Sequence, residues 1–326
     1  MPSSTSSHVR TVADVGEFGI IADIVRGLSM PPAVAVGPGD DAAVYLINGS
    51  AVTSTDMLVE GVHFRRDWSS GTEIGRKAAA VNAADLEAMG ATPLVMTVGL
   101  GVPGDLPVQW VHDFATGLRA EADAAGLTLV GGDTTGARDV TICVTAIGQT
   151  AGREPVLRNG ARPGDVVAYR GRLGWAAAGL AALGRGFRSP RAAVDSQRVP
   201  LVPYGAGRQA ALAGATAMLD VSDGLIADLG HIAEASGVRI DLRSDAFEVP
   251  DPVQAVAAAT GKDPLGFVLT GGEDHALAAT FPPGTVPSEW VEIGLVREAE
   301  ENGTPRVTVD GGAWVADSGG WEHFRS

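Results

Sequence analysis

Short acidic turns that contain glycine recur at the ends of apolar segments in both halves of the chain. Gly131-Gly132-Asp133 follows the apolar run 127–130, and Asp220-Val221-Ser222-Asp223-Gly224 ends the run that begins at residue 217. Further strand-like and helix-like segments alternate around them. The repeated order of strand, acidic turn, helix and strand indicates an α/β or α+β fold with layered helices.

The length of the chain predicts two domains. A chain of 326 residues exceeds the usual size of one compact core, and its hydrophobic content of 45% is enough to bury two. Gly152-Arg153-Glu154-Pro155 interrupts the regular pattern near the middle. We therefore expect an N-terminal domain over 1–150 and a C-terminal domain over 151–326.

The charge of the chain restricts its partners. The net charge is −15, with 39 acidic residues against 24 basic ones, which argues against a nucleic acid or an anionic membrane. An anionic small molecule remains compatible if metal ions reverse the local field. Only two basic residues, Lys77 and Lys262, are lysines, so side-chain contacts to phosphate would come mainly from arginine.

Cysteine content and the first residues predict a cytoplasmic protein. Cys143 is the only cysteine, so the chain forms no internal disulfide and fits a reducing compartment. Its place in the alternating run 140–144 indicates a buried structural thiol. Residues 1–7 do not resemble a signal peptide, and no apolar run reaches the roughly 20 residues that span a bilayer.

Periodicity and turn residues predict the main elements. A hairpin is expected around Asn48-Gly49, joining strands 42–47 and 51–55. Other strands are expected at 93–100, 127–130, 140–148, 166–170, 217–221 and 238–242. Helices are expected at 17–28, 72–89, 107–125, 175–183, 205–213 and 225–236.

The stretch 52–64 brings oxygen-bearing side chains to the end of an apolar strand. Ser54, Thr55 and Asp56 follow the β-branched start of this stretch, and His63 lies near its end. Asp85 lies on an otherwise apolar helix face, where a carboxylate needs a partner. That partner is either a metal ion or a neighbouring group such as Arg76.

The other acidic turns also allow a functional and a structural interpretation. Gly132 and Asp133 can hold a phosphate and its cation, or they form an ordinary turn. Asp220 and Asp223 can bind metal, although Ser222 or Asp223 could simply cap the next helix. Glu273 in Gly271-Gly272-Glu273-Asp274 either contacts a substrate or lies in a solvated turn, and His63 either contacts a ligand or packs.

Several carboxylates without matching lysines need cations between them, and hard oxygen ligands suit magnesium bound to a polyphosphate. The sequence lacks the Gly-x-x-x-x-Gly-Lys-Ser/Thr phosphate loop, the protein-kinase His-Arg-Asp and Asp-Phe-Gly motifs, and the Gly-x-Ser-x-Gly elbow. It also lacks a Cys/His cluster with zinc spacing. These absences argue against the usual nucleotide hydrolases, protein kinases, serine hydrolases and zinc enzymes.

The ordered set of motifs resembles the thiamine-monophosphate kinase family, from about Gly16 to Phe324. The motifs that carry the resemblance are Gly39-Asp40-Asp41-Ala42, Ser54-Thr55-Asp56 with Gly61-Val62-His63-Phe64, Val81-Asn82 with Asp85-Leu86-Glu87-Ala88-Met89-Gly90, Gly131-Gly132-Asp133-Thr134-Thr135, Asp220-Val221-Ser222-Asp223-Gly224-Leu225, Gly271-Gly272-Glu273-Asp274 and Gly320-Trp321-Glu322-His323-Phe324.

The resemblance implies the two-domain fold of the aminoimidazole-ribonucleotide-synthetase superfamily, with a homodimer formed through the N-terminal sheet. It implies Mg²⁺-dependent transfer of the ATP γ-phosphoryl group to thiamine monophosphate, giving thiamine diphosphate. Magnesium ligands would be Asp41, Ser54, Thr55, Asp56, Asp85, Asp133, Asp220 and Asp223, of which Asp56, Asp85, Asp133 and Asp223 would be catalytic. ATP contacts would be Gly132, Asp133, Arg158 and Ser222, and thiamine monophosphate contacts would be His63, Glu273 and Trp321.

The chemistry of the acceptor agrees with an aspartate-rich site. Its phosphate is already an anion, so direct in-line transfer needs charge neutralisation and alignment rather than a general base. The closest rivals are a selenophosphate synthetase, an amidine-forming cyclo-ligase and a non-catalytic nucleotide-binding protein. A selenium enzyme would need a reactive thiol near its N-terminal glycine-rich segment. The only thiol, Cys143, lies instead in the middle of an expected strand.

Overall fold

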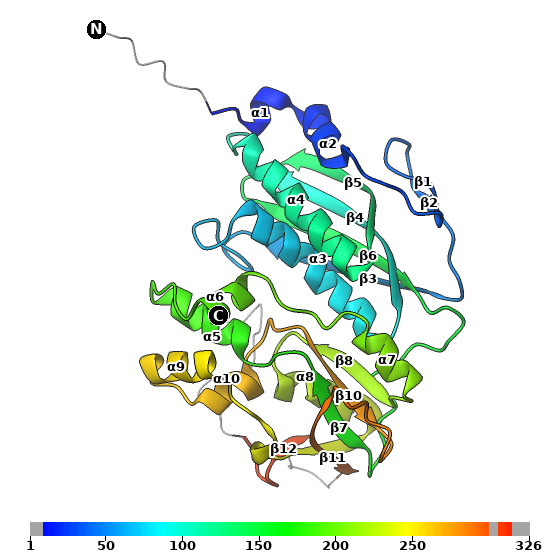
Figure 1. The fold of residues 1–326 in the computed structure, drawn as a ribbon, viewed down its shortest axis with the longest axis vertical. Coiled ribbons are helices and arrows are strands. Elements are labelled where there is room, and N and C mark those ends of the chain that lie inside the picture. Colours follow the sequence, from blue (N-terminus) through cyan, green and yellow to red (C-terminus); the bar gives the residue numbers. More distant parts are fainter. Residues whose placement is uncertain (1–8, 300–305, 315–326) are drawn as a thin grey trace. The chain divides into compact units, whose positions relative to one another are not determined.

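A computed structural model of the protein describes residues 9–299 and 306–314. The chain forms two compact units (Figure 1). The first comprises Met1–Leu46, Thr55–Ala79 and Val95–Ala146, and the second comprises Ile47–Ser54, Ala80–Leu94 and Ile147–Ser326. The chain therefore passes between the units several times, within strands and within one long helix.

The first unit is built on a four-stranded sheet whose strand order is β3-β6-β4-β5. Strands β4 and β5 are parallel, and a separate antiparallel pair joins β1 to β2. The elements, some of which extend into the second unit, are α1 (Val12–Val15), α2 (Glu17–Val25), β1 (Val34–Val36), β2 (Val44–Tyr45), β3 (Ala51–Val59), α3 (Gly71–Ala88), β4 (Thr92–Val102), α4 (Val108–Ala125), β5 (Thr128–Gly136) and β6 (Thr141–Gln149).

Helices α3 and α4 pack against each other over one face of this sheet (Figure 1). Glycines allow their close approach: a Cβ at Gly75 would lie 2.1 Å from the Phe114 carbonyl oxygen. On β6, Ile142 is buried while Cys143 is only half-buried. The expectation of a buried Cys143 is therefore wrong, because the alternation of the strand turns this side chain to the face opposite Ile142.

The second unit is built on a six-stranded sheet with the order β12-β9-β11-β7-β10-β8. All its neighbouring pairs are antiparallel except β12 with β9. The elements are β7 (Val166–Arg170), α5 (Trp175–Gly184), α6 (Arg191–Arg198), α7 (Ala206–Leu212), β8 (Ala217–Val221), α8 (Leu225–Ser236), β9 (Val238–Leu242), the 3-10 helix η1 (Ser244–Ala246), α9 (Asp251–Thr260), α10 (Pro264–Thr270), β10 (Ala276–Phe281), β11 (Val291–Glu298) and β12 (Val307–Val309).

Strands β8 and β10 are buried along their whole length because both faces of the sheet are covered. Leu219 and Val221 of β8 pack in a core with residues of α8 and α10, whereas Met218 packs in a second core with residues of α7. Asp220 is thus a carboxylate in a strand that is otherwise apolar. Such a group needs a polar partner.

The structure confirms much of the predicted secondary structure. Strands β7, β8 and β9 and helix α8 have the bounds expected from the sequence. Helices α6 and α9 and strands β10, β11 and β12 were not predicted. No helix in the described part of the chain is both long and apolar enough to cross a bilayer.

Two local predictions are wrong. The Asn48-Gly49 turn does not join a hairpin, since β2 pairs with β1 and β3 lies in another sheet. The Asn48 carbonyl instead accepts from the Ala151 amide at 2.9 Å. Residues 131–136 continue strand β5 rather than form a turn, because Gly132 pairs with Val98 of β4, whose carbonyl oxygen would lie 2.1 Å from an added Cβ.

Candidate active site

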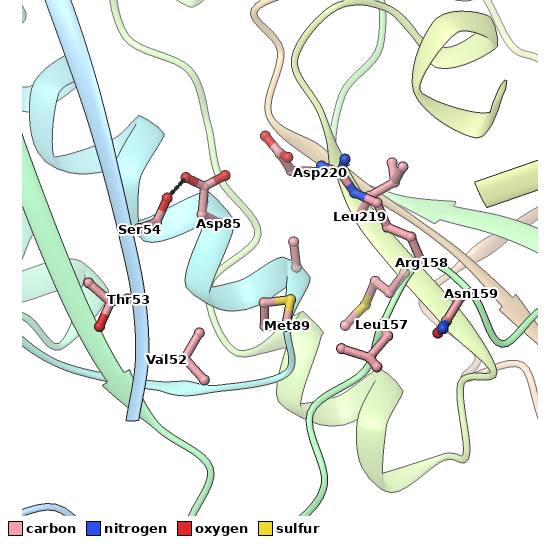
Figure 2. A pocket seen from close by; sticks show the side chains of 12 residues that line it. Val52, Thr53, Ser54, Asp85, Met89, Leu157, Arg158, Asn159, Leu219 and Asp220 are labelled. Carbon is pink, nitrogen blue, oxygen red and sulfur yellow. Dashed lines mark hydrogen bonds between the residues drawn. The ribbon is translucent and has the colours of Figure 1, made fainter. Parts of the chain in front are cut away.

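A pocket of about 490 Å³ in the second unit gathers several of the predicted site residues. Figure 2 shows the side chains of Asp85, from α3, and Asp220, from β8, at one end of it. Apolar side chains, including Met89, lie at the other end. The lining residues are Val52, Thr53, Ser54, Asp85, Ala88, Met89, Leu157, Arg158, Asn159, Met218, Leu219 and Asp220.

Asp85 of α3 contacts a serine of strand β3, which precedes it along the chain. The Ser54 hydroxyl donates a short hydrogen bond to Asp85 Oδ2 (Figure 2). The Arg76 guanidinium bonds Glu121 with a nitrogen to oxygen distance of 2.8 Å. The serine fixes one oxygen of the carboxylate that α3 presents to the pocket.

Asp220 is held by a histidine that the sequence did not single out. His275 Nδ1 lies 2.9 Å from Asp220 Oδ2, and both side chains are buried. A carboxylate only accepts hydrogen bonds, so Nδ1 carries the proton in this contact. Burial lowers the pKa of His275, but the hydrogen bond and charge of Asp220, helped by Glu273 and Asp85, raise it overall.

The turn after β8 is organised by Asp228 of α8. Its Oδ2 accepts hydrogen bonds from the amides of Ser222, Asp223 and Gly224, each at 3.0 Å. Burial is the main cause that raises the pKa of Asp228 to about 7, and the charge of Asp220 adds to it, while amide bonds oppose the shift. The N-cap of α8 is Gly224, without a side-chain cap, so neither Ser222 nor Asp223 has the capping role considered from the sequence.

The two acids of the turn before β10 have different surroundings. Asp274 is buried, and its carboxylate accepts from the amides of Gly174 and Ala176 at the start of α5, at 2.5 and 2.8 Å. Burial raises the pKa of Asp274 to about 7 against these hydrogen bonds. Glu273 is half-buried and has a left-handed backbone with φ of 68°. Of the two acids, Glu273 is the more accessible to a ligand.

In β3, the alternation of side chains places Ser54, Thr55 and Asp56 on two different faces of the strand. Ser54 and Asp56 are half-buried and share one face of the strand, whereas Thr55 is exposed on the other. The Thr55 hydroxyl lies 2.9 Å from the hydroxyl of Thr145 on β6. Any contact of Thr55 with a ligand on the Ser54 side would therefore have to use its backbone.

His63 lies in a loop that is tied to β3 and α3. The Val59 amide donates to His63 Nδ1 at 3.0 Å, and the buried Lys77 ammonium donates to the His63 carbonyl oxygen at 3.1 Å. Because Nδ1 accepts, the neutral ring carries its proton on Nε2. The hydrogen-bond donor of this half-buried ring is thus Nε2.

The remaining predicted residues are placed as follows. Asp41 lies in an exposed bend, where its amide donates to Asp40 Oδ1 at 2.8 Å. Gly132 and Asp133 are exposed on β5, and Asp133 pairs with Gly99 of β4. Trp321 lies outside the described residues. The convergence of acids from both units around shared cations stays a prediction.

The donor set of the pocket suits a hard cation. Ser54, Asp85 and Asp220 offer only oxygens, which are the ligands that Mg²⁺ prefers. Within residues 9–299 and 306–314, no three His, Cys, Asp or Glu side chains are grouped so that they could hold a metal ion by themselves. Mg²⁺ commonly keeps several waters and uses one or two carboxylates with substrate phosphates, so the pocket fits a Mg²⁺-nucleotide better than a free ion.

His275 is a site residue that sequence reasoning missed. Asp228 has the structural role that its place on a helix face with Leu225, Leu229 and Ile232 indicates, because its carboxylate holds the turn after β8. His275 is a single histidine before an apolar strand and carries no local signal. Only the pairing of β10 with β8, which sets Leu277 opposite Asp220, brings it to the carboxylate.

The chain matches known protein families and relatives over most of its length. Residues 39–150 match the family described as AIR synthase related protein, N-terminal domain, and residues 162–286 match its C-terminal domain. The thiamine-monophosphate kinase of Mycobacterium tuberculosis is 47% identical over 323 residues, covering 98% of this chain and 95% of the relative. That of Corynebacterium glutamicum is 41% identical over 326 residues, covering 96% and 95%.

A solved structure shows the same similarity. AaThiL, complexed with AMPPCP and TMP, matches with a TM-score of 0.78 and 33% identity over 98% of this chain and all of the other. The acidic turns, the two AIR synthase related domains and the identity over nearly the whole length lead to one conclusion: the chain belongs to the AIR synthase related proteins and, among them, to the thiamine-monophosphate kinase family.

Proposed function

We propose that the protein transfers the γ-phosphoryl group of ATP to thiamine monophosphate, giving thiamine diphosphate and ADP. The observation that carries the proposal is the pocket of the second unit, in which two carboxylates lie at one end and apolar side chains at the other. An apolar end suits a purine base, and an acidic end suits a polyphosphate that carries cations. The membership of the kinase family supports the same assignment.

In the proposed reaction a phosphate oxygen of thiamine monophosphate attacks the γ-phosphorus of ATP. A new phosphorus to oxygen bond forms as the bond to the bridging oxygen of ADP breaks, and the electron pair leaves with ADP. The residues of the chain bind and align the two anions. Arg158, an exposed pocket residue, would contact phosphate, and Ser54 would hold the orientation of Asp85 through its hydrogen bond.

We assign magnesium to the oxygen donors of the pocket and of the acidic turns. Within the pocket, Asp85 and Asp220 would hold it through carboxylate oxygens; Asp223 follows on the same turn. Bound Mg²⁺ would neutralise the developing charge on the phosphates. Asp41, Asp56 and Asp133, with the Thr55 backbone, are also proposed as magnesium ligands; these residues belong to the first unit.

Glu273, His63 and Trp321 are proposed to contact thiamine monophosphate. Glu273 can face the thiazolium cation, and Trp321 can offer an aromatic face to it. His63 would donate from Nε2 to an acceptor on the substrate, because its Nδ1 is already engaged by Val59.

The test is an assay of the purified protein with magnesium, ATP and thiamine monophosphate. Equal amounts of thiamine diphosphate and ADP are expected, and Asp85→Asn should slow the formation of both about 10²-fold without unfolding the protein. ATP binding without turnover would contradict the proposal and favour a non-catalytic nucleotide-binding protein. Labelled phosphate trapped on the protein after exposure to ATP alone would contradict direct in-line transfer.

We also propose that the protein works as a homodimer in the cytoplasm. The face of the four-stranded sheet opposite α3 and α4 carries exposed β3 side chains, among them Thr55 and Met57, which is 52% exposed. A sheet with an uncovered, partly apolar face is commonly completed by another layer. The single Cys143 fits a reducing compartment.

A further inference from the structure

The turn before β10 holds two residues in an unfavourable backbone conformation. Glu273 has φ of 68° and His275 has φ of 51°, although neither is glycine. Left-handed backbone at such residues is unfavourable and persists where surrounding contacts impose it. Here the imposing contacts come from the turn after β8.

Backbone hydrogen bonds join the two turns. The Glu273 amide donates to the Ser222 carbonyl oxygen at 2.8 Å, and the His275 amide donates to the Val221 carbonyl oxygen at 2.9 Å. Gly272 makes this approach possible, since an added Cβ would lie 2.5 Å from the Ser222 oxygen. The left-handed conformation of this turn therefore brings the imidazole of His275 against β8.

The partner of the imidazole is the carboxylate that β8 presents to the pocket. Nδ1 donates to Asp220 Oδ2 at 2.9 Å, with the imidazole only 9% and the carboxylate only 6% exposed. The ring donates through Nδ1 both as this neutral tautomer and as the cation. One oxygen of Asp220 is thus engaged, and the rotation of the carboxylate is restricted.

We propose that His275 is a positioning residue of the phosphoryl-transfer site, which holds Asp220 so that its second oxygen can bind the magnesium of the nucleotide. The inference rests on the proposed function, because it takes Asp220 as a magnesium ligand. Hydrogen-bonded partners of metal ligands commonly affect metal affinity about 10–100-fold. His275 itself touches neither substrate nor metal in this arrangement.

Two variants separate positioning from backbone strain. Asparagine and glycine both accept a left-handed backbone, but only asparagine keeps a donor near the position of Nδ1. The probe is the ATP analogue AMPPCP, and the measured quantity is the ratio of its Kd without magnesium to its Kd with magnesium, obtained by calorimetry. Thermal unfolding of each variant is recorded under the same conditions.

We expect His275→Gly to lower this ratio about tenfold while the magnesium-free Kd stays unchanged, and His275→Asn to restore it to within about threefold of the wild type. A ratio for His275→Gly equal to that of the wild type would overturn the inference. An equal loss in both variants would also overturn it. If His275→Gly does not fold, His275→Asn decides alone: a ratio within about threefold of the wild type supports the inference, and a larger loss refutes it.

Failure of this inference is distinguishable from failure of the proposed function. A wild-type protein that forms thiamine diphosphate, together with unchanged magnesium dependence in His275→Gly, refutes only the role of His275. A wild-type protein that binds AMPPCP with magnesium but forms no thiamine diphosphate refutes the kinase reaction. The binding ratio still reports on His275 in that case.

Discussion

Replacing Asp228 should disturb both the stability and the chemistry of the second unit. Its single oxygen Oδ2 accepts three consecutive amides, those of Ser222, Asp223 and Gly224, each at 3.0 Å. Asp228→Ala removes all three acceptor contacts at once. The turn that carries Asp223 and contacts the Glu273 backbone would then lose its internal support.

The size of the effect follows from burial. A buried amide left without an acceptor costs about 1–3 kcal/mol. Gly224 is buried, whereas Ser222 and Asp223 are only half-buried, so the loss should be largest at the Gly224 amide and we expect Asp228→Ala to cost about 3 kcal/mol in total. Asp228→Asn keeps one oxygen that can accept the amides. Because the pKa of Asp228 is raised to about 7, loss of the charge should add little to the cost. We therefore expect Asp228→Asn to lower the free energy of unfolding by about 1 kcal/mol.

Urea unfolding and steady-state kinetics measure the two consequences. In the alanine variant kcat/KM for ATP should fall about 10²-fold, since small displacements of aligned groups have effects of this size. The matched control is Glu234→Ala on the same helix, which removes only an exposed ion pair with Arg306 and should cost about 0–1 kcal/mol. An alanine variant at Asp228 that matches this control in stability and activity would refute the reasoning.

Three further predictions concern other parts of the chain. Asp85→Asn should lower kcat about 10²-fold and Ser54→Ala about tenfold, measured as thiamine diphosphate formed; equal activity of either variant and the wild type would remove the Ser54–Asp85 pair from the site. Burial raises the pKa of Glu87, although hydrogen bonds from the Gly205 and Gly207 amides at the start of α7 lower it. The folded protein therefore binds the Glu87 proton more tightly than the unfolded chain does. The resulting stabilisation is complete below the ordinary pKa of 4.5 and is lost as the pH rises through the folded-state pKa. Glu87→Gln should therefore gain stability relative to the wild type as the pH rises in urea unfolding, and a difference independent of pH would contradict this. Met57→Glu should shift the protein towards monomer in light scattering if the uncovered sheet face forms the proposed dimer, whereas an unchanged mass would place the contact elsewhere.

Local sequence patterns were sufficient for elements whose own residues determine them. Strands β7, β8 and β9 and helix α8 agree with their expected bounds, because strong apolar periodicity and flanking turn residues mark them. The same rules were misleading at Asn48-Gly49, where a strong hairpin signal lies between strands of different sheets. They were also misleading at Gly132, where glycine serves close contact of β5 with β4 rather than a turn.

The candidate site shows the same division between local and distant information. Asp85 could be recognised as unusual because a carboxylate stood on an apolar helix face, but its partner Ser54 lies 31 positions earlier in the chain. Asp274 resembled its neighbour Glu273 in sequence, yet the structure uses it to bind the amides at the start of α5. Sequence spacing does not distinguish these two roles.

The sequence by itself determined the residue types from which a site for a polyanion could be built, and it determined most of the elements that present them, since both depend on side-chain chemistry and short-range periodicity. Only the tertiary structure decided which groups meet. The contacts of Asp228 with its turn and of His275 with Asp220 depend on helix packing and on the register of β10 against β8. Such contacts join residues at separations that no local pattern encodes.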